Sequence, residues 1–213
     1  MNGGIRRARV VLGFAAMAIL GGTFLGAAQA RVQSGADDQG ARAILRDASG
    51  NQLGIVKFSQ ESGKVLVRAS VQGLSPGFHG FHVHANNDPS NGTGCIANSS
   101  QPSNTWFVSA DGHYKLGSEV HGAHQGDMPL LLLNGTGALD SWATSRFDTD
   151  RFAVADIIGK AIIVHALADN FNNIPLGAGS EQYVANSQAA IDKTNATGNA
   201  GDRLLCGVVE ATG

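Results

Sequence analysis

Hydrophobic residues in this chain recur mainly in short runs rich in β-branched side chains, which is the pattern of strands in an antiparallel sheet. Turn signals such as Ser49-Gly50-Asn51 and Ser62-Gly63 separate the first runs, and Asn134-Gly135 is a hairpin signal. The runs predict eight strands, over 41–46, 53–58, 65–71, 78–84, 128–133, 137–142, 161–165 and 204–209. Because no amphipathic helix accompanies them, we expect an all-β fold, an eight-stranded antiparallel sandwich or barrel.

Two long segments, 86–127 and 168–202, break this pattern because they are rich in Gly, Asn and Ser and poor in strand formers. Loops of this length in a compact domain are usually functional or disordered. Six of the seven histidines lie in or at the edge of the first segment, and the seventh, His165, comes shortly before the second. Disorder would not gather histidines in this way, so the pattern favours two functional loops and a metal site.

The first thirty residues have the composition of an export signal. Arg6, Arg7 and Arg9 precede an apolar run over 10–28, and Ala28-Gln29-Ala30 is typical of a cleavage site. We therefore predict a signal peptide over 1–30, a flexible lead-in over 31–39 and one domain over 40–213. An uncleaved membrane anchor is the alternative, because the run is close to bilayer-spanning length. Cleavage would give a periplasmic or secreted protein with no stable membrane association.

Composition and charge limit the kinds of binding partner that we expect for this protein. The chain has 213 residues, of which 43% are hydrophobic, enough for one domain with a real core. Lys and Arg total 15 against 17 Asp and Glu, and no basic run follows the first ten residues, so no nucleic-acid partner is expected. Cys95 and Cys206 are the two cysteines. In an oxidising compartment they are candidates for a disulfide, with two buried free thiols as the alternative.

Four histidines form a candidate copper site. His82-Val83-His84 places two imidazoles on one face of a predicted strand, because side chains alternate with a period of two. His165, at the end of an apolar strand, can supply a third nitrogen, and His113 a fourth. Four imidazoles suit Cu(II), which outcompetes other divalent ions for nitrogen donors.

A second candidate site follows along the chain. His113, His121, His124 and Asp127 offer three nitrogens and one carboxylate oxygen, a plausible tetrahedral set for zinc. Spacing alone leaves open whether His113 serves both ions. Only Gly122 and Ala123 separate His121 from His124, so both rings must reach zinc from a short turn.

Four ordered motifs resemble the signatures of the Cu/Zn superoxide dismutases, and the resemblance covers about residues 40–210. They are GFHGFHVH over 77–84, HQGDMP over 124–129, GKAIIVH over 159–165 and GNAGDRLLCGVV over 198–209. The long segment between Cys95 and His113 resembles the exported bacterial branch. The resemblance implies a Greek-key β-sandwich and an antioxidant enzyme that converts superoxide to O2 and H2O2 by alternating reduction and oxidation of a His-bound copper.

The resemblance also implies a role for each site residue. It implies one copper per chain on His82, His84, His113 and His165, and one zinc per chain on His113, His121, His124 and Asp127. Asp169 matches the carboxylate that links a copper-ligand and a zinc-ligand imidazole. Arg203 matches the catalytic arginine that guides the superoxide anion, and His113 the bridging imidazole that takes up and donates a proton. His79 resembles a packed structural histidine.

Other functions stay open at this stage. A copper-binding or copper-delivery protein could use the same scaffold without turnover, and a structural or adhesion sandwich would bind no ordered metal. A copper-only dismutase depends on whether His121 and Asp127 reach the second ion. Nothing in the strand pattern distinguishes a monomer from a homodimer. Four asparagines lie in N-x-S/T sequons, which matter only if the source organism glycosylates them: Asn91, Asn98, Asn134 and Asn195.

Overall fold

Strands make up most of the regular structure in residues 40–171 and 187–213, the part of the chain that the computed structural model describes. The expected signal peptide over 1–30 and lead-in over 31–39 lie outside this part. Seven described strands form one antiparallel sheet in the order β5-β8-β9-β1-β2-β3-β7. Their bounds are β1 Gly40–Arg46, β2 Gln52–Glu61, β3 Lys64–Gln72, β5 Phe81–His84, β7 Trp142–Thr149, β8 Ala161–His165 and β9 Arg203–Thr212.

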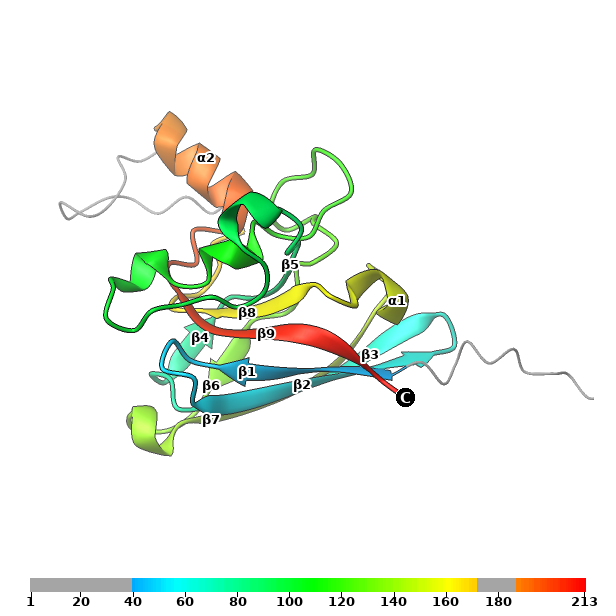
Figure 1. Cartoon of the computed structure of the whole chain (residues 1–213), viewed down its shortest axis with the longest axis horizontal. Helices are drawn as coiled ribbons and strands as arrows, with labels where there is room; N and C mark the ends of the chain where they lie inside the picture. Colours follow the sequence, from blue (N-terminus) through cyan, green and yellow to red (C-terminus); the bar gives the residue numbers. More distant parts are fainter. Residues whose placement is uncertain (1–39, 172–186) are drawn as a thin grey trace, which may run out of the picture. The chain divides into compact units, whose positions relative to one another are not determined.

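A second, two-stranded sheet joins the two edges of the first. It pairs β4 (Gly77–His79) with β6 (Leu131–Leu133). The expected strand over 78–84 is divided at Gly80, so β4 pairs with β6 while β5 pairs with β8. An isolated antiparallel bridge pairs Asn134, which follows β6, with Trp142, the first residue of β7, and β7 is the other edge strand. The strands therefore curl around one core (Figure 1), and the expected all-β architecture is confirmed.

Side-chain alternation along the strands explains the core. In β3, Val67, Ala69 and Val71 point inward with at most 3% exposure, whereas Arg68 and Ser70 between them are exposed. Burying a Val or Leu side chain contributes about 1.5–3 kcal/mol, so a one-residue slip in register would place these side chains in water. The strand β5 differs because all four of its residues are buried, which places its two histidines inside the protein.

The expected strand over 137–142 does not form. The chain instead turns through a short 3-10 helix, η4 (Ala138–Asp140), and the next strand begins at Trp142. The Asp140 carboxylate accepts hydrogen bonds from the backbone N–H groups of Thr136 and Gly137 at 3.1 and 2.7 Å. These local bonds satisfy the backbone of the turn, which removes the need for a strand partner.

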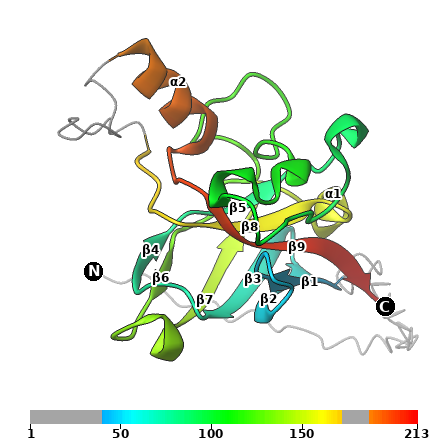
Figure 2. The same ribbon diagram turned by 60° about the vertical axis from the view of Figure 1, so that its left-hand side comes forward.

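The first long segment and the described part of the second, 168–171 and 187–202, gather on one side of the sheet, above β5 and β8 (Figures 1 and 2). The first contains only short 3-10 helices: η1 Pro89–Asn91, η2 Ser103–Thr105 and η3 Val108–Ala110. The second contains α2 (Gln188–Thr197), a helix that the sequence reading did not predict. Ser187 caps its first turn and Gly198, at φ 65°, ends it. A four-residue helix, α1 (Val154–Ile157), precedes β8.

The predicted disulfide is present between Cys95 in the first long segment and Cys206 in β9, with 5.5 Å between the Cα atoms. It fastens the loop to the sheet strand that begins with Arg203. Among the described residues no helix has the length and hydropathy needed to cross a bilayer.

Candidate metal centre

Four buried imidazoles meet where β5 and β8 lie side by side. His82 and His84 come from β5 and His165 from the end of β8, while His113 forms an isolated backbone bridge with His84. One ring nitrogen from each of the four lies within 4.8 Å of the others, and none of the four residues is more than 4% exposed. The structure thus brings together the whole set expected for copper.

Hydrogen bonds decide which nitrogens of His84 and His165 are free. His84 Nδ1 donates to the carbonyl oxygen of Asp111 at 2.8 Å, and His165 Nδ1 donates to that of Gly201 at 3.1 Å. A carbonyl only accepts, so in each neutral ring the proton sits on Nδ1 and Nε2 carries a lone pair. The two Nε2 atoms are 3.4 Å apart. Two lone pairs facing each other in a buried space need a cation between them.

The other two rings complete the set. His82 Nε2 donates to Asp169 Oδ2 at 2.8 Å, which leaves His82 Nδ1 as the acceptor. His82 Nδ1 and His113 Nε2 are buried and have no hydrogen-bond partner among the described residues. Buried polar atoms in folded proteins are nearly always satisfied. These orphaned nitrogens therefore fit a bound metal ion, and four imidazole nitrogens are a donor set that Cu(II) favours.

A second cluster converges on one carboxylate oxygen. Asp127 Oδ1 lies 2.9 Å from His113 Nδ1, 3.3 Å from His121 Nδ1 and 3.3 Å from His124 Nδ1. The Nδ1 atoms of His113 and His124 are also 3.3 Å apart. A tetrahedral zinc ion with bonds of about 2.0–2.1 Å holds its ligand atoms about 3.3 Å apart. The spacing of these four atoms therefore fits zinc.

The second cluster can also be grouped with His82 in place of His124, since a nitrogen of His82 lies within 4.8 Å of His113, His121 and Asp127. We prefer His124 because the hydrogen bonds of His82 commit its Nε2 to Asp169, which leaves Nδ1 for the first cluster. His124 Nε2 donates to the carbonyl oxygen of Glu119 at 3.0 Å, so its Nδ1 is free to face Asp127.

The ring of His113 joins the two clusters. Its Nδ1 faces Asp127 in the second cluster, while its Nε2 is the orphaned atom of the first. The His113 and His82 ring centroids are 4.0 Å apart. One imidazole thus presents a different nitrogen to each cluster.

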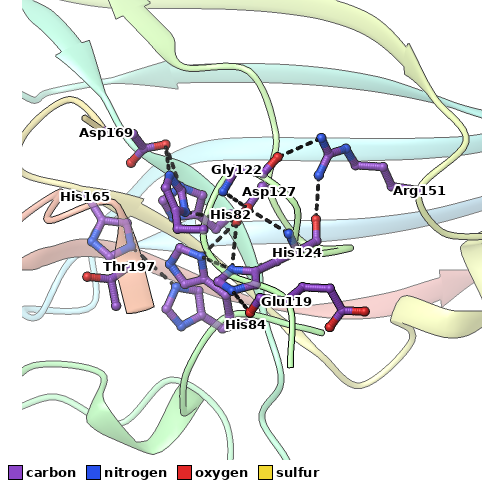
Figure 3. A network of polar contacts seen from close by, with 12 residues as sticks. His82, His84, Glu119, Gly122, His124, Asp127, Arg151, His165, Asp169 and Thr197 are labelled. Carbon is purple, nitrogen blue, oxygen red and sulfur yellow. Dashed lines mark hydrogen bonds and ion pairs between the residues drawn. The ribbon is translucent and has the colours of Figure 1, made fainter. Parts of the chain in front are cut away.

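Asp169 makes a second link between the clusters, and Figure 3 shows it beside His82. Its Oδ2 lies 2.8 Å from His82 Nε2 and 3.5 Å from His121 Nε2. Burial alone would raise the pKa of Asp169, but hydrogen bonds from His121 and His82 outweigh it and lower the pKa to about 2. Asp169 therefore stays ionised and orients both rings.

Burial governs the charge of the histidines. It lowers the pKa of His84 and His165 well below the usual value, and it lowers that of His113 to about 3 with help from neighbouring His82. Burial would also lower the pKa of His121, but Asp127 and Asp169 raise it to about 9. His84, His113 and His165 are therefore neutral at physiological pH, which is the protonation state that metal ligation requires.

Arg203 lies beside the first cluster in a cavity of about 260 Å³, whose lining includes His165, Lys193 and Thr197. Its guanidinium donates to the carbonyl oxygens of Phe107 and Asp111 at 2.5 and 2.6 Å. Asp111 O is also the acceptor for His84 Nδ1. A larger cavity, about 520 Å³ beside the disulfide, has none of the candidate ligands in its lining.

Several residues of the site escaped the sequence reading. Arg151 donates to the carbonyl oxygens of Gly122 and His124 (Figure 3). The end of α2 also contacts the second cluster, because His121 N–H donates to Asn195 O at 2.7 Å. Cap residues around 188–197 were the only signal for that helix, and nothing in the sequence marked Arg151. His79 bonds to the carbonyl oxygens of His165 and Ser75, as expected of a structural histidine.

Fold and site together define a class: a curled antiparallel β-barrel protein with an imidazole-rich centre for two metal ions. Residues 52–209 match the family model described as copper/zinc superoxide dismutase. This chain belongs to the copper/zinc superoxide dismutase family.

Similar proteins agree with this membership. Superoxide dismutase [Cu-Zn] of Mycobacterium tuberculosis is 34% identical over 192 residues, covering 83% of this chain and 74% of the relative. Extracellular superoxide dismutase [Cu-Zn] of Onchocerca volvulus is 32% identical over 187 residues, covering 83% and 79%. Among solved structures, the clock protein EA4 is similar with a TM-score of 0.56 and 25% identity, covering 82% of this chain and 95% of that one.

Proposed function

We propose that this protein is an exported superoxide dismutase that binds copper on His82, His84, His113 and His165 and zinc on His113, His121, His124 and Asp127. One observation carries the proposal. Four buried imidazole nitrogens whose partner nitrogens are already hydrogen-bonded face one another, next to a cavity that contains a guanidinium. Copper bound there supplies a one-electron couple, so that two superoxide anions and two protons become O2 and H2O2.

Arg203 binds and orients the anion. Two of the five N–H donors of its guanidinium hold backbone carbonyls, and the remaining donors are available to a small anion in the cavity. The two carbonyl contacts fix the orientation of the Arg203 guanidinium. The disulfide at Cys206 fixes β9, the strand that carries Arg203. Lys193 adds a second positive charge to the cavity lining. A planar fork held in this way suits a diatomic anion better than a mobile lysine would.

His113 serves as the proton carrier. Its Nε2 has no protein partner among the described residues, whereas its Nδ1 is held by Asp127 at 2.9 Å. A proton taken up at Nε2 therefore sits within the first cluster, where the His82 ring lies 4.0 Å away, while the ring of His113 stays in place. Asp169 holds His82 and His121 on either side, which limits rotation of the neighbouring rings.

Export is part of the proposal. The Arg-rich, apolar first thirty residues and the disulfide both support a periplasmic or secreted protein. The extracellular relative in Onchocerca volvulus is consistent with it. We propose superoxide as the partner, with neither nucleic acid nor a stable membrane contact. Sedimentation of the mature chain distinguishes a monomer from a homodimer.

The deciding experiment measures cyanide-sensitive superoxide dismutation by the chain from Arg31 onward, with its copper and zinc content counted. Activity with one of each metal per chain supports the whole proposal. Activity with copper alone keeps the enzyme and removes the zinc site. Tightly bound copper without turnover would instead identify a copper-binding or copper-delivery protein.

A further inference from the structure

The seven residues His121–Asp127 form a short turn, here called the zinc turn, that carries three of the four proposed zinc ligands. The carboxylate of Asp127 organises it from within. Its Oδ2 accepts from Gly122 N–H at 2.7 Å and from His124 N–H at 3.0 Å, while Oδ1 faces the cluster. The internal bonds give the turn its shape, but they do not place it relative to the sheet.

Backbone bonds attach the zinc turn to the rest of the protein near its two ends. His121 N–H donates to Asn195 O of α2 at 2.7 Å, and Gly126 O accepts from Val83 N–H of β5 at 2.8 Å. Between these points a cavity of about 350 Å³ separates the turn from the end of β7, with Gly122, Asp127 and Phe147 in its lining. Side-chain packing at that gap is therefore incomplete, and something else must hold the middle of the turn.

Arg151 reaches the middle of the turn from the other wall of this cavity (Figure 3). One terminal nitrogen of its guanidinium donates to His124 O at 2.7 Å and the other to Gly122 O at 3.0 Å. Of the described hydrogen bonds, these two alone join residues 122–124 to the strand β7 region. The fork thus fastens the carbonyls on both sides of the turn's centre.

The base of Arg151 is itself rigid. It follows β7, which pairs with β3 along its whole length, and Arg151 N–H donates to Thr149 Oγ1 at 3.2 Å. The next residue, Phe152, is 5% exposed in the core, and Val154 N–H donates to Gln60 Oε1 at 3.0 Å. A guanidinium on such a support can fix a loop, because its planar fork loses little freedom for each bond formed.

We propose that Arg151 is a positioning residue for the zinc site: it holds the short zinc turn at the distance from the sheet at which His121, His124 and Asp127 converge with His113. This inference rests on the proposed zinc site. Arg151 touches no metal ligand atom; it acts through the backbone of His124 and Gly122. It compensates for the short connection between His121 and His124, which leaves the turn little backbone of its own to attach.

The test compares Arg151→Gln with Arg146→Gln in the copper- and zinc-loaded protein. Arg146 lies on β7 and is exposed, so its replacement removes the same charge from the strand that precedes Arg151 without touching the zinc turn. Zinc affinity and release rate are measured by competition with a chelator, and copper affinity by the same method. Co²⁺ placed in the zinc site reports its geometry through the visible spectrum.

We expect Arg151→Gln to weaken zinc binding by about 10- to 100-fold and to alter the Co²⁺ spectrum, since partners that orient ligands typically have effects of that size. Copper affinity should change little, and Arg146→Gln should match the wild type in both metals. Arg151→Lys should restore only part of the zinc affinity, because one ammonium cannot replace a two-carbonyl fork.

Three results would overturn the inference. Zinc affinity in Arg151→Gln equal to that of Arg146→Gln would show that the Arg151 guanidinium does not contribute to zinc binding. Equal losses of copper and zinc, with a lower Tm of the metal-free protein, would show a general structural role. Full rescue by Arg151→Lys would show that charge alone matters. If the wild-type protein binds no zinc, the proposed zinc site fails as well, which separates that failure from these three.

Discussion

Replacing Gly80 with alanine tests how closely the two proposed metal clusters depend on backbone packing. An added Cβ at this position would lie 2.5 Å from Asp169 Oδ1, 2.8 Å from Ala200 Cβ and 3.0 Å from His82 Cε1. Favourable contacts between nonbonded heavy atoms lie near 3.5–4.0 Å, so each of these is an overlap. The Asp169 carboxylate can move away only by loosening its 2.8 Å contact with His82.

The expected cost has two parts. Overpacking a filled site costs about 1–3 kcal/mol, and weakening a buried hydrogen bond to a charged group costs about 1–3 kcal/mol more. For a chain of this size, a loss of about 2–6 kcal/mol corresponds to a fall in Tm of roughly 4–24 °C. Copper affinity should also fall about 10- to 100-fold, because Asp169 orients the imidazole of His82.

Calorimetry of the metal-free and metal-loaded protein measures the change in Tm, and chelator competition measures copper affinity. Gly112→Ala is the control, because an added Cβ at Gly112 meets no atom within 4 Å. A Gly80→Ala protein with the Tm and copper affinity of Gly112→Ala would refute the argument that Gly80 makes room for Asp169.

Three further predictions concern other parts of the site. Arg203→Gln should lower the dismutation rate at least tenfold while copper stays bound, and the wild-type rate should fall as salt rises, since the screening length is about 8 Å at physiological ionic strength; loss of copper from the variant would contradict this role. Cys95→Ser opens a bridge that spans 111 residues, and urea unfolding should show a loss of about 2–5 kcal/mol; unchanged unfolding would argue against it. In the metal-free protein, burial lowers the pKa of His84 below 6.5, so the unfolded state binds its proton first and stability falls as pH drops below 6.5. The pKa of His121 is raised to about 9, so its contribution is lost as pH rises from 6.5 through 9; urea unfolding across this range should show a maximum, and a flat profile would contradict both assignments.

The amino-acid sequence alone was enough to predict most strands and the members of both clusters. Alternation with a period of two placed His82 and His84 on one strand, because that period follows from the backbone of any strand. The pair Cys95 and Cys206 was the only possible disulfide within the chain. The prediction was wrong where local hydrogen bonds compete with strand pairing. The Asp140 carboxylate closes a turn over part of the predicted strand 137–142.

Only the tertiary structure determined which ring nitrogens face the clusters and which residues hold the candidate ligands in place. The nitrogens of His84 and His165 that face each other are selected by the carbonyls of Asp111 and Gly201, which belong to other segments of the chain. Arg151 reaches a turn 27 residues away from its own position to hold His124 O. Contacts of this kind depend on the path of the folded backbone rather than on local periodicity. A sequence pattern therefore predicts the candidate ligands, while the fold determines their protonation, orientation and support.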